Sequence, residues 1–205
     1  MHIDYRAARR TLARRDPVIR GLMRVYGECG LAGAQHDDPF VALVHAICSQ
    51  QLSTKAAATI AGRFDALFGG RPTPAAVALV SDEQLRAVGL SGQKVRYVRD
   101  LCERITSGAL PLDSLGTMSD DDVIAALTAV KGIGRWTAEM FLMFRLHRPD
   151  VLPVGDLGIV KAVQKAYRLR KVPTPARLTQ IGESWRPYRS VACWYLWASL
   201  ENKPL

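Results

Sequence analysis

The amino-acid sequence predicts an all-α protein, and two observations support this. Helix-start signals recur along the chain, each followed by an apolar, helix-like run. No stretch alternates apolar and polar residues over the length of a strand between turn signals. No low-complexity linker interrupts the 205 residues, which are enough to bury a core, so we treat residues 1–205 as one domain.

The expected helices begin at residue types that commonly cap helices. Such starts occur in order at Asp38 before Pro39, Ser53, Ser81, Ser119, and Thr174 before Pro175. Gly69 and Gly70 are expected to end the helix that begins at Ser53. Gln84 and Asp122 stand three residues after Ser81 and Ser119, which is the spacing of a capping box, with Asp the weaker partner.

The segment VKGIGRWTAEM, Val130–Met140, predicts a tight hairpin between two helices, one over 119–130 and one over about 134–146. Gly132 and Gly134 permit positive φ and carry no Cβ. Successive N–H groups can then point outward together at the positive end of the second helix, which suits a phosphate. A plain tight turn without a ligand is the alternative.

The charge balance predicts a polyanionic partner. The 28 Lys and Arg residues outnumber the 19 Asp and Glu residues, which gives a net charge of +9 and a pI of about 9.7. Nucleic acid is the first candidate and an anionic membrane surface the second. Lys131 and Arg135 place part of this charge at the hairpin. Phosphate contacts there position the protein and read no base sequence.

Insertion into a membrane is not expected. The longest nearly apolar run, Val191–Leu200, is far shorter than the ~20 residues that span a bilayer. The basic N-terminal residues are not followed by the apolar core of a signal peptide. We therefore expect a cytoplasmic protein, associated with the nucleoid if it is bacterial.

The four cysteines, Cys29, Cys48, Cys102 and Cys193, lie far apart and form no Cys-x-x-Cys pair. This spacing argues against a zinc site or an iron–sulfur cluster and suits a reducing compartment. We interpret all four as small buried hydrophobic residues and expect no metal site.

Asp156 lies in the segment LPVGDLGIV, Leu152–Val160, at the start of another apolar, helix-like run. An Asp in front of a helix is a routine N-cap, and this is the simplest interpretation of its position.

Several motifs, in order, resemble the helix–hairpin–helix superfamily of DNA base-excision glycosylases, and within it the 3-methyladenine DNA glycosylase II branch. These are AICSQQLSTKAAATIAGRF, GLSGQKVRYVRDL, LTAVKGIGRWTAEMFLMF, LPVGDLGIVKA and WRPYRSVACWYLW, which together cover about Phe40 to Leu200. The resemblance implies two helical subdomains with the active cleft between them and the hairpin, residues 130–136, at its rim. Residues 1–36 are too few for the N-terminal β-rich domain of some members.

The resemblance implies that Asp156 is the catalytic carboxylate. Cleavage of an N-glycosidic bond builds positive charge on the sugar, which a carboxylate stabilises while it orients the attacking water. The resemblance also places Trp136 and Trp197 in a pocket for the flipped base, with a core position as the alternative for Trp197. Met140 and Leu157 stand where well-known members have an aromatic residue, so the pocket is expected to be wider or less aromatic. Trp185 and Trp194 are expected in the core.

Two further segments are expected to bind DNA. In SQQLS, Ser49–Ser53, the family inserts a side chain where the base has left, so the expected wedge is Gln51, with Leu52 as its neighbour and rival. Gln side chains that only satisfy backbone groups are the alternative. In GLSGQK, Gly89–Lys94, a second Gly-rich turn places Lys94, and Arg96 after it, to hold phosphates. A solvated helix face is the alternative there.

The sequence as a whole predicts a monofunctional DNA glycosylase that removes alkylated bases from double-stranded DNA as a monomer. No cofactor is expected, with a monovalent cation at the hairpin as the one alternative. A non-catalytic DNA-binding module, a bifunctional glycosylase/lyase and a helical scaffold are the rivals. The lyase would want a Lys at position 136, where the chain has Trp136.

Overall fold

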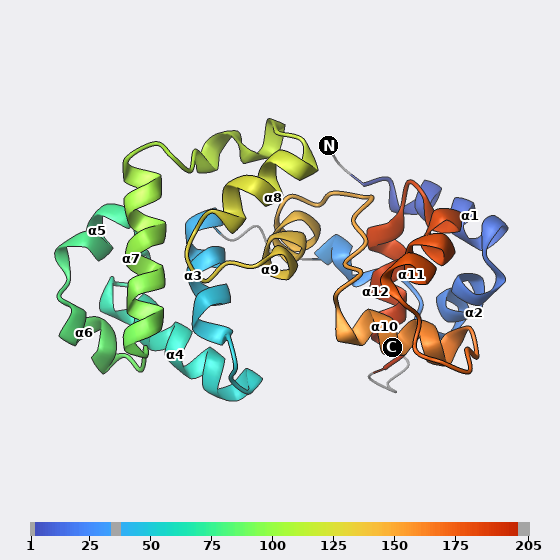
Figure 1. The fold of residues 1–205 in the computed structure, drawn as a ribbon, viewed down its shortest axis with the longest axis horizontal. Helices are drawn as coiled ribbons and strands as arrows, with labels where there is room; N and C mark the ends of the chain where they lie inside the picture. The colour runs from blue at the N-terminus through green and yellow to red at the C-terminus, as the bar shows by residue number, and fades with distance from the viewer. Residues whose placement is uncertain (1–2, 34–37, 201–205) are drawn as a thin grey trace. The chain divides into compact units, whose positions relative to one another are not determined.

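The computed structural model describes residues 3–33 and 38–200 (Figure 1). All regular structure in these residues is helical and none is strand, which confirms the all-α prediction. The chain divides into two compact units. Met1–Gln35 and Leu142–Leu205 form one, here called the discontinuous unit, and His36–Phe141 form the other, the inserted unit. Residues 34–36, at the end of the segment judged too short for a β domain, lie outside the described residues.

The inserted unit is built around one long helix. Its helices are α3 (Pro39–Ser49), α4 (Thr54–Leu67), α5 (Pro74–Leu79), α6 (Asp82–Ala87), α7 (Gly92–Thr106), α8 (Asp120–Thr128) and α9 (Arg135–Met140), with a 3₁₀ turn, η2, at Leu112–Thr117. Helix α7 packs against α3, α5 and α6, while α4 packs on α3 and α8 on α9. The core between them is apolar and fully buried at Leu43, Phe64 and Leu101.

The discontinuous unit joins the two ends of the chain. It holds α1 (Tyr5–Arg15), α2 (Pro17–Tyr26), α10 (Leu157–Ala166), α11 (Pro175–Gly182) and α12 (Arg189–Ala198), with 3₁₀ turns η1 (Gly30–Gly33) and η4 (Glu183–Trp185). Helix α12 packs against both α10 and α2, and its Cys193, Tyr195 and Leu196 are buried. The core of this unit thus forms where helices from the C-terminal part of the sequence pack against helices from the N-terminal part.

The helix starts confirm most of the capping predictions. Asp38, Ser53 and Thr174 each accept a hydrogen bond from a backbone N–H of the first helical turn. Ser81 and Gln84 form a complete capping box. The second box is only half formed. Ser119 accepts from the Asp122 N–H at 3.2 Å, but the Asp122 carboxylate accepts from the Ser119 hydroxyl at 2.6 Å, because an Asp side chain is short for reaching back to the backbone.

The helix after the hairpin is shorter than predicted. The α-helical part ends at Met140, and Phe141–Arg145 continue as a π turn, η3. The chain passes from the inserted unit to the discontinuous unit within this turn. Such π turns are rare and often accompany functional sites.

Buried side chains follow the expected pattern in most places. The four cysteines are free and buried, which confirms their interpretation as small core residues. Trp185 is fully buried, and its indole N–H donates to the buried Asp16 at 2.9 Å. Trp194 is half-buried, and its ring covers Gly30 so closely that a Cβ there would lie 2.8 Å from it. Among the helices of the described residues, none has the length and apolarity to cross a bilayer.

Candidate active site and nucleic-acid interface

The two glycines of the hairpin between α8 and α9 serve different purposes. Gly132 has φ +82°, and a Cβ there would lie 2.1 Å from the Tyr97 ring. No other residue fits at this position, for reasons internal to the fold. Gly134 has φ −92° and caps α9, and a Cβ there would meet nothing within 4 Å. The fold thus leaves the backbone at Gly134 open to an approaching ligand.

Asp100 on α7 holds the hairpin in place. The backbone N–H of Lys131 donates to its Oδ2 at 2.9 Å, and the Lys131 ammonium lies 3.3 Å from its Oδ1. Arg104, one turn along α7, donates to Oδ2 at 2.8 Å. Burial opposes the charge of Asp100, but the bonds from Lys131 and Arg104 outweigh it and lower the pKa of this carboxyl. Because the Lys131 side chain remains 70% exposed, this pairing leaves it available to solvent as well.

Helix α9 presents both charge and an aromatic ring. Arg135 donates through Nε to Glu139 at 3.0 Å, and the Arg135 side chain is 66% exposed whereas that of Glu139 is buried. Trp136 is 51% exposed, so it does not belong to the core of the inserted unit. Met140 is half-buried one turn further on.

The predicted wedge lies in a strained turn between α3 and α4. Gln51 is exposed and has φ +58°, which is uncommon for any residue but Gly, Asn or Asp. Leu52 beside it is 40% exposed. Backbone strain of this kind persists only where the surroundings enforce it, and it gathers at functional sites.

Hydrogen bonds connect this turn to the hairpin and to α7. The Gln50 amide donates to the carbonyl of Gly132 at 2.7 Å. The ammonium of Lys94 donates to the carbonyls of Cys48 at 2.7 Å and Gln50 at 2.9 Å. Lys94 was expected to hold a phosphate, but its three N–H donors are directed largely at the end of α3. Gln50 satisfies a backbone group, as the alternative interpretation held, whereas Gln51 points to solvent.

Asp156 is the N-cap that its position predicted, and its catalytic role stays a prediction. It is 8% exposed and caps α10, its Oδ1 accepting from the Ile159 N–H at 2.7 Å. The same oxygen accepts from the indole N–H of Trp197 on α12 at 3.0 Å. A routine N-cap needs only the first of these bonds. The second one fixes the carboxylate relative to an aromatic ring.

Gly158 and Phe144 complete the surroundings of this acid, and sequence reasoning missed both. A Cβ at Gly158 would lie 2.9 Å from the Asp156 Oδ1 and 3.1 Å from the Trp197 ring, so only Gly lets the ring approach. Phe144 stacks on Trp197 with 5.9 Å between ring centroids and an interplanar angle of 29°. The π turn carries Phe144, and the predicted α-helix gave no reason to single it out. Leu157, next to the acid, is 73% exposed.

Residues before and at the start of α12 form hydrogen bonds to the segment that precedes Asp156. Arg189 donates to the Asp150 carboxylate at 2.7 Å, and Arg186 does the same at 2.7 Å. The Ser190 hydroxyl donates to the Arg148 carbonyl at 2.6 Å and accepts from the Val151 N–H at 3.0 Å. Helix α12 therefore supplies both the ring beside Asp156 and the anchor of its loop.

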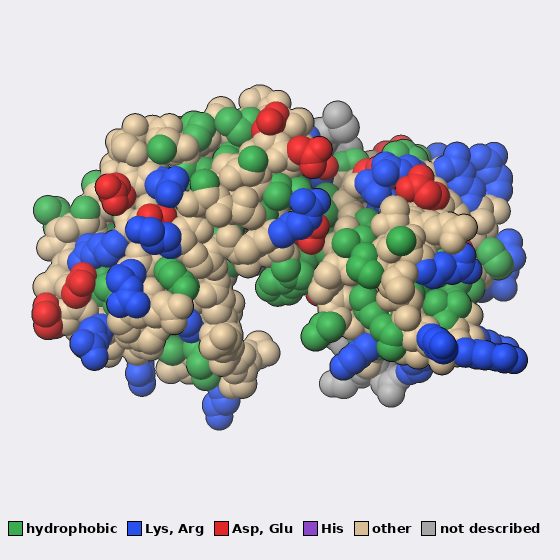
Figure 2. Space-filling view, in the orientation of Figure 1, with side chains coloured by type: hydrophobic (Ala, Val, Ile, Leu, Met, Phe, Trp, Pro, Cys, Tyr) green, Lys and Arg blue, Asp and Glu red, His purple; other side chains and the backbone are tan. Residues whose placement is uncertain are grey.

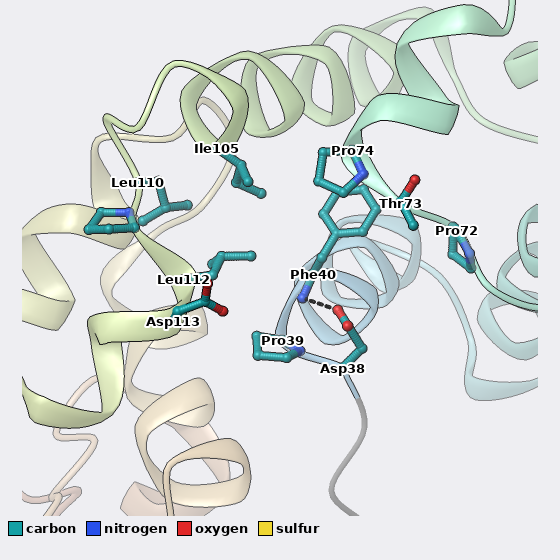
Figure 3. A pocket seen from close by; sticks show the side chains of 11 residues that line it. Asp38, Pro39, Phe40, Pro72, Thr73, Pro74, Ile105, Leu110, Leu112 and Asp113 are labelled. Atoms are coloured by element: carbon teal, nitrogen blue, oxygen red, sulfur yellow. Dashed lines mark hydrogen bonds between the residues drawn. The ribbon is translucent and has the colours of Figure 1, made fainter.

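A hollow in the inserted unit lies apart from all of these residues (Figure 3). It has a volume of about 270 Å³ and is lined mainly by apolar and Pro side chains, among them Phe40, Ile105 and Leu112. Asp38 at its edge caps α3 through a bond from the Phe40 N–H, drawn as a dashed line in Figure 3. None of the predicted site residues lines it.

The structure groups the predicted residues by unit. Gln51, Leu52, Lys94 and the hairpin residues belong to the inserted unit, together with Trp136 and Met140. Asp156, Leu157 and Trp197 belong to the discontinuous unit. The cleft that would join the two groups around one base stays a prediction.

Comparison with known proteins shows the family to which the chain is similar. Residues 44–187 match the model of the HhH-GPD superfamily of base excision DNA repair proteins. DNA-3-methyladenine glycosylase 1 of Schizosaccharomyces pombe is 39% identical over 163 residues, which are 78% of this chain and 72% of the relative. The crystal structure of a DNA-3-methyladenine glycosidase from Bacillus halodurans is similar with a TM-score of 0.85 and 41% identity, over 94% of this chain and 88% of that one. The 3-methyladenine DNA glycosylase of S. pombe in complex with abasic DNA gives a TM-score of 0.80 and 33% identity, over 97% and 98%.

Proposed function

The chain belongs to the HhH-GPD superfamily of base excision DNA repair proteins, and from this premise we propose that it is a DNA-3-methyladenine glycosylase that hydrolyses the N-glycosyl bond of alkylated bases. The observation that carries the proposal is the buried carboxylate of Asp156, held by the Ile159 N–H and the Trp197 indole. It is supported by two relatives of which this chain covers more than two thirds.

Asp156 acts on the sugar. As the bond between base and sugar breaks, positive charge develops on the sugar ring, and a fixed carboxylate stabilises it more than water does. Two N–H donors on Oδ1 hold the carboxylate in one orientation, so little reorganisation is needed during the reaction. The carboxylate also orients the water that attacks the sugar.

A single carboxylate is enough when the leaving base is already positively charged. Glycoside hydrolases usually use a second acid to protonate the leaving group. Bases such as 3-methyladenine and 7-methylguanine carry a positive charge from their alkylation and leave without protonation. The substrate class we propose is therefore cationic, alkylated purines.

Aromatic faces recognise such a base. The exposed ring of Trp136 and the ring of Trp197 each offer a π face, which attracts a cation by ~0.5–2 kcal/mol. The bond from Trp197 to Asp156 fixes that ring, so recognition and catalysis share one side chain. Met140 and Leu157 contribute no π face, and we propose that the pocket accepts a wider range of lesions for that reason.

The inserted unit holds double-stranded DNA. We propose that the open backbone at Gly134, with Arg135 and Lys131, contacts phosphates without reading sequence. The strained and exposed Gln51 fills the gap left by the flipped base, with Leu52 beside it. The solved relative bound to abasic DNA supports this partner.

The reaction ends at an abasic site in an intact strand. A lyase needs an amine that attacks the sugar and forms a Schiff base. Position 136, which would carry that amine, is Trp136, and the nearby ammonium of Lys131 lies 3.3 Å from Asp100. Water is then the only nucleophile, and we propose a monofunctional enzyme that acts as a monomer.

Incubation with a panel of duplexes, each with one lesion, tests the proposal. Release of 3-methyladenine and 7-methylguanine is expected, with strand breakage only after hot alkali and no adduct trapped by borohydride. Failure to release either base would overturn the glycosylase assignment. A borohydride-trapped adduct would overturn the monofunctional assignment alone.

A further inference from the structure

Helices α1 and α2 carry an unusual amount of positive charge. Residues 5–26 contain no Lys, and their basic residues are Arg6, Arg9, Arg10, Arg14, Arg15, Arg20 and Arg24. Figure 2 shows basic side chains gathered over these two helices at the right edge of the view. This segment precedes residues 44–187, which match the family model, and the proposed reaction does not use it.

Four of these arginines share one shallow groove. Arg9 and Arg10 from α1 face Arg20 and Arg24 from α2 across a floor that contains Ala13 and Met23, and the groove has a volume of about 340 Å³. The antiparallel pairing of the two helices therefore concentrates charges that lie up to 15 residues apart in the sequence.

The acidic residues nearby do little to neutralise the groove. Asp16, the only acid among residues 5–26, lies between the two helices, is buried and accepts from Tyr167 and Trp185. Glu28 lies 3.9 Å from Arg9 and is almost fully exposed, so it contributes little. Within residues 3–33 and 38–200, Arg10 and Arg24 have no ion-pair partner.

That these basic residues are all arginines indicates a ligand that carries phosphates. A guanidinium is planar and binds phosphate oxygens in pairs, which a Lys ammonium does not do. A row of such groups along a groove suits the regular phosphates of a nucleic-acid backbone. Leu12 and Ile19 on the apolar faces of α1 and α2 are fully buried, and Val25 is the one large apolar side chain of these helices that is exposed, which is too little apolar surface to enter a lipid bilayer.

We propose that the α1–α2 groove binds the phosphodiester backbone of nucleic acid outside the segment that holds the lesion. Helix α12 packs against both α10, which Asp156 caps, and α2, which supplies one side of the groove. The phosphates come either from the flanking arm of the same duplex or from a second nucleic acid. That one possible ligand is the duplex carrying the lesion rests on the proposed function. That the groove binds phosphates does not.

A binding experiment with two duplex lengths tests this. The duplexes carry one abasic-site analogue and span roughly one or four helical turns, about 12 or 42 base pairs. The variant is Arg10→Ala/Arg24→Ala, and the control is Arg170→Ala/Lys171→Ala, which removes equal charge at exposed positions of the same unit. Affinity is measured by fluorescence anisotropy over a range of salt concentrations, with melting temperatures to verify folding.

If the flanking arm is the ligand, the variant lowers the salt slope on the long duplex by about 1.8, since each lost phosphate contact removes ~0.9. The short duplex and the control then show no change. If a second nucleic acid is the ligand, wild-type protein saturated with the short duplex binds an added undamaged duplex, and the variant loses that binding.

Three results would overturn the proposal. One is an unchanged slope on the long duplex together with no second binding event, and another is an equal loss in the control. The third result comes from anionic lipid vesicles added as a further ligand, and it is a variant that loses binding to the vesicles and to neither duplex. Single-turnover excision on a separate short duplex that carries 3-methyladenine distinguishes this test from the proposed function, because its absence in the wild type counts against the glycosylase and leaves the binding result standing.

Discussion

The two units differ in how exposed their candidate site residues are. In the inserted unit the candidate DNA-binding segments expose their backbone to solvent, whereas in the discontinuous unit the candidate catalytic acid is buried. Gly134 and Gln51 face solvent. The backbone next to them is held by hydrogen bonds, from Gln50 to the Gly132 carbonyl, from Lys94 to the Cys48 and Gln50 carbonyls, and from the Lys131 N–H to Asp100. A unit that grips a phosphate backbone needs open N–H groups on a rigid support, since every sequence must fit.

Asp156 in the discontinuous unit is arranged for a different task. It is 8% exposed, and an indole and a backbone N–H meet on one of its oxygens. A group that stabilises a transient charge needs a fixed position in a site from which water is largely excluded. Under the proposed function, the inserted unit binds any DNA and the discontinuous unit acts on one bond, and substitutions should separate the two.

The largest effect is expected from Asp156→Asn. The amide keeps the shape of the side chain but lacks the negative charge, so single-turnover excision should fall on the order of 10³-fold. DNA binding should stay equal or become tighter, because a negative charge is removed near phosphates. Rates are measured on a 3-methyladenine duplex, with anisotropy for binding. An excision rate close to the wild type would show that the acid lies elsewhere.

The two hairpin glycines provide a matched pair. Gly132→Ala places a methyl group against the Tyr97 ring at a positive φ, and we expect it to lower the free energy of unfolding by ~2–4 kcal/mol. Gly134→Ala enters open space at an ordinary φ and should change it by less than ~0.5 kcal/mol. Denaturant titration distinguishes them.

The Gly134 variant also tests whether the hairpin contacts DNA phosphates. Gly134→Ala should weaken binding to lesion and undamaged duplexes by the same factor, since it obstructs a phosphate contact. A loss confined to one lesion would remove the hairpin from the general DNA interface.

The bond between Trp197 and Asp156 is tested by Trp197→Phe, which keeps an aromatic face but has no N–H. Loss of a hydrogen bond to a carboxylate should slow excision about tenfold. Phe144→Leu, the control, removes the stacking partner and keeps the bond, so its effect should be smaller. Equal losses in the two variants would mean that the ring stack, and no hydrogen bond, positions the acid.

The smallest effect is expected from Lys94→Met. If the ammonium only supports the turn before Gln51, the salt slope of binding should not change, while excision should fall a few-fold as the wedge loosens. Arg96→Met, at an exposed position of the same helix, is the control and should lower the slope by ~0.9 if Arg96 meets a phosphate. A lower slope for Lys94→Met would return Lys94 to the DNA interface.

Local signals in the sequence were sufficient for several helix starts but not for the length of the helix after the hairpin or for the contacts between helices. Asp38, Ser53 and Ser81 could be recognised because a cap and its partner lie within one turn. Lys94 and Asp100 find their partners 31 to 46 residues away, so their roles depend on packing that no local pattern encodes. Lys94 follows a Gly-rich turn, which suggested a phosphate contact; in the structure its ammonium donates to carbonyls of the protein, and the phosphate contact stays a prediction.

The candidate acid was identified by resemblance and not by pattern. Its pattern fits an N-cap equally well, and the structure shows that it is one. The bond from Trp197 joins residues 41 positions apart, and the contact with Phe144 depends on a π turn. Neither contact follows from helix periodicity. Periodicity predicts which residues share a face of one helix, but not which residues of a neighbouring helix they contact.

The burial of the cysteines has a consequence for the conditions under which such an enzyme works. Burial raises the pKa of Cys29 to about 12 and those of Cys48 and Cys102 to about 11. The thiolate is the form of Cys that attacks electrophiles, so at neutral pH these side chains present almost none. The electrophiles that methylate DNA also methylate reactive thiols. All four thiols are buried, and Cys29, Cys48 and Cys102 stay protonated at neutral pH, so these side chains are poor targets for the reagents that produce the proposed substrate.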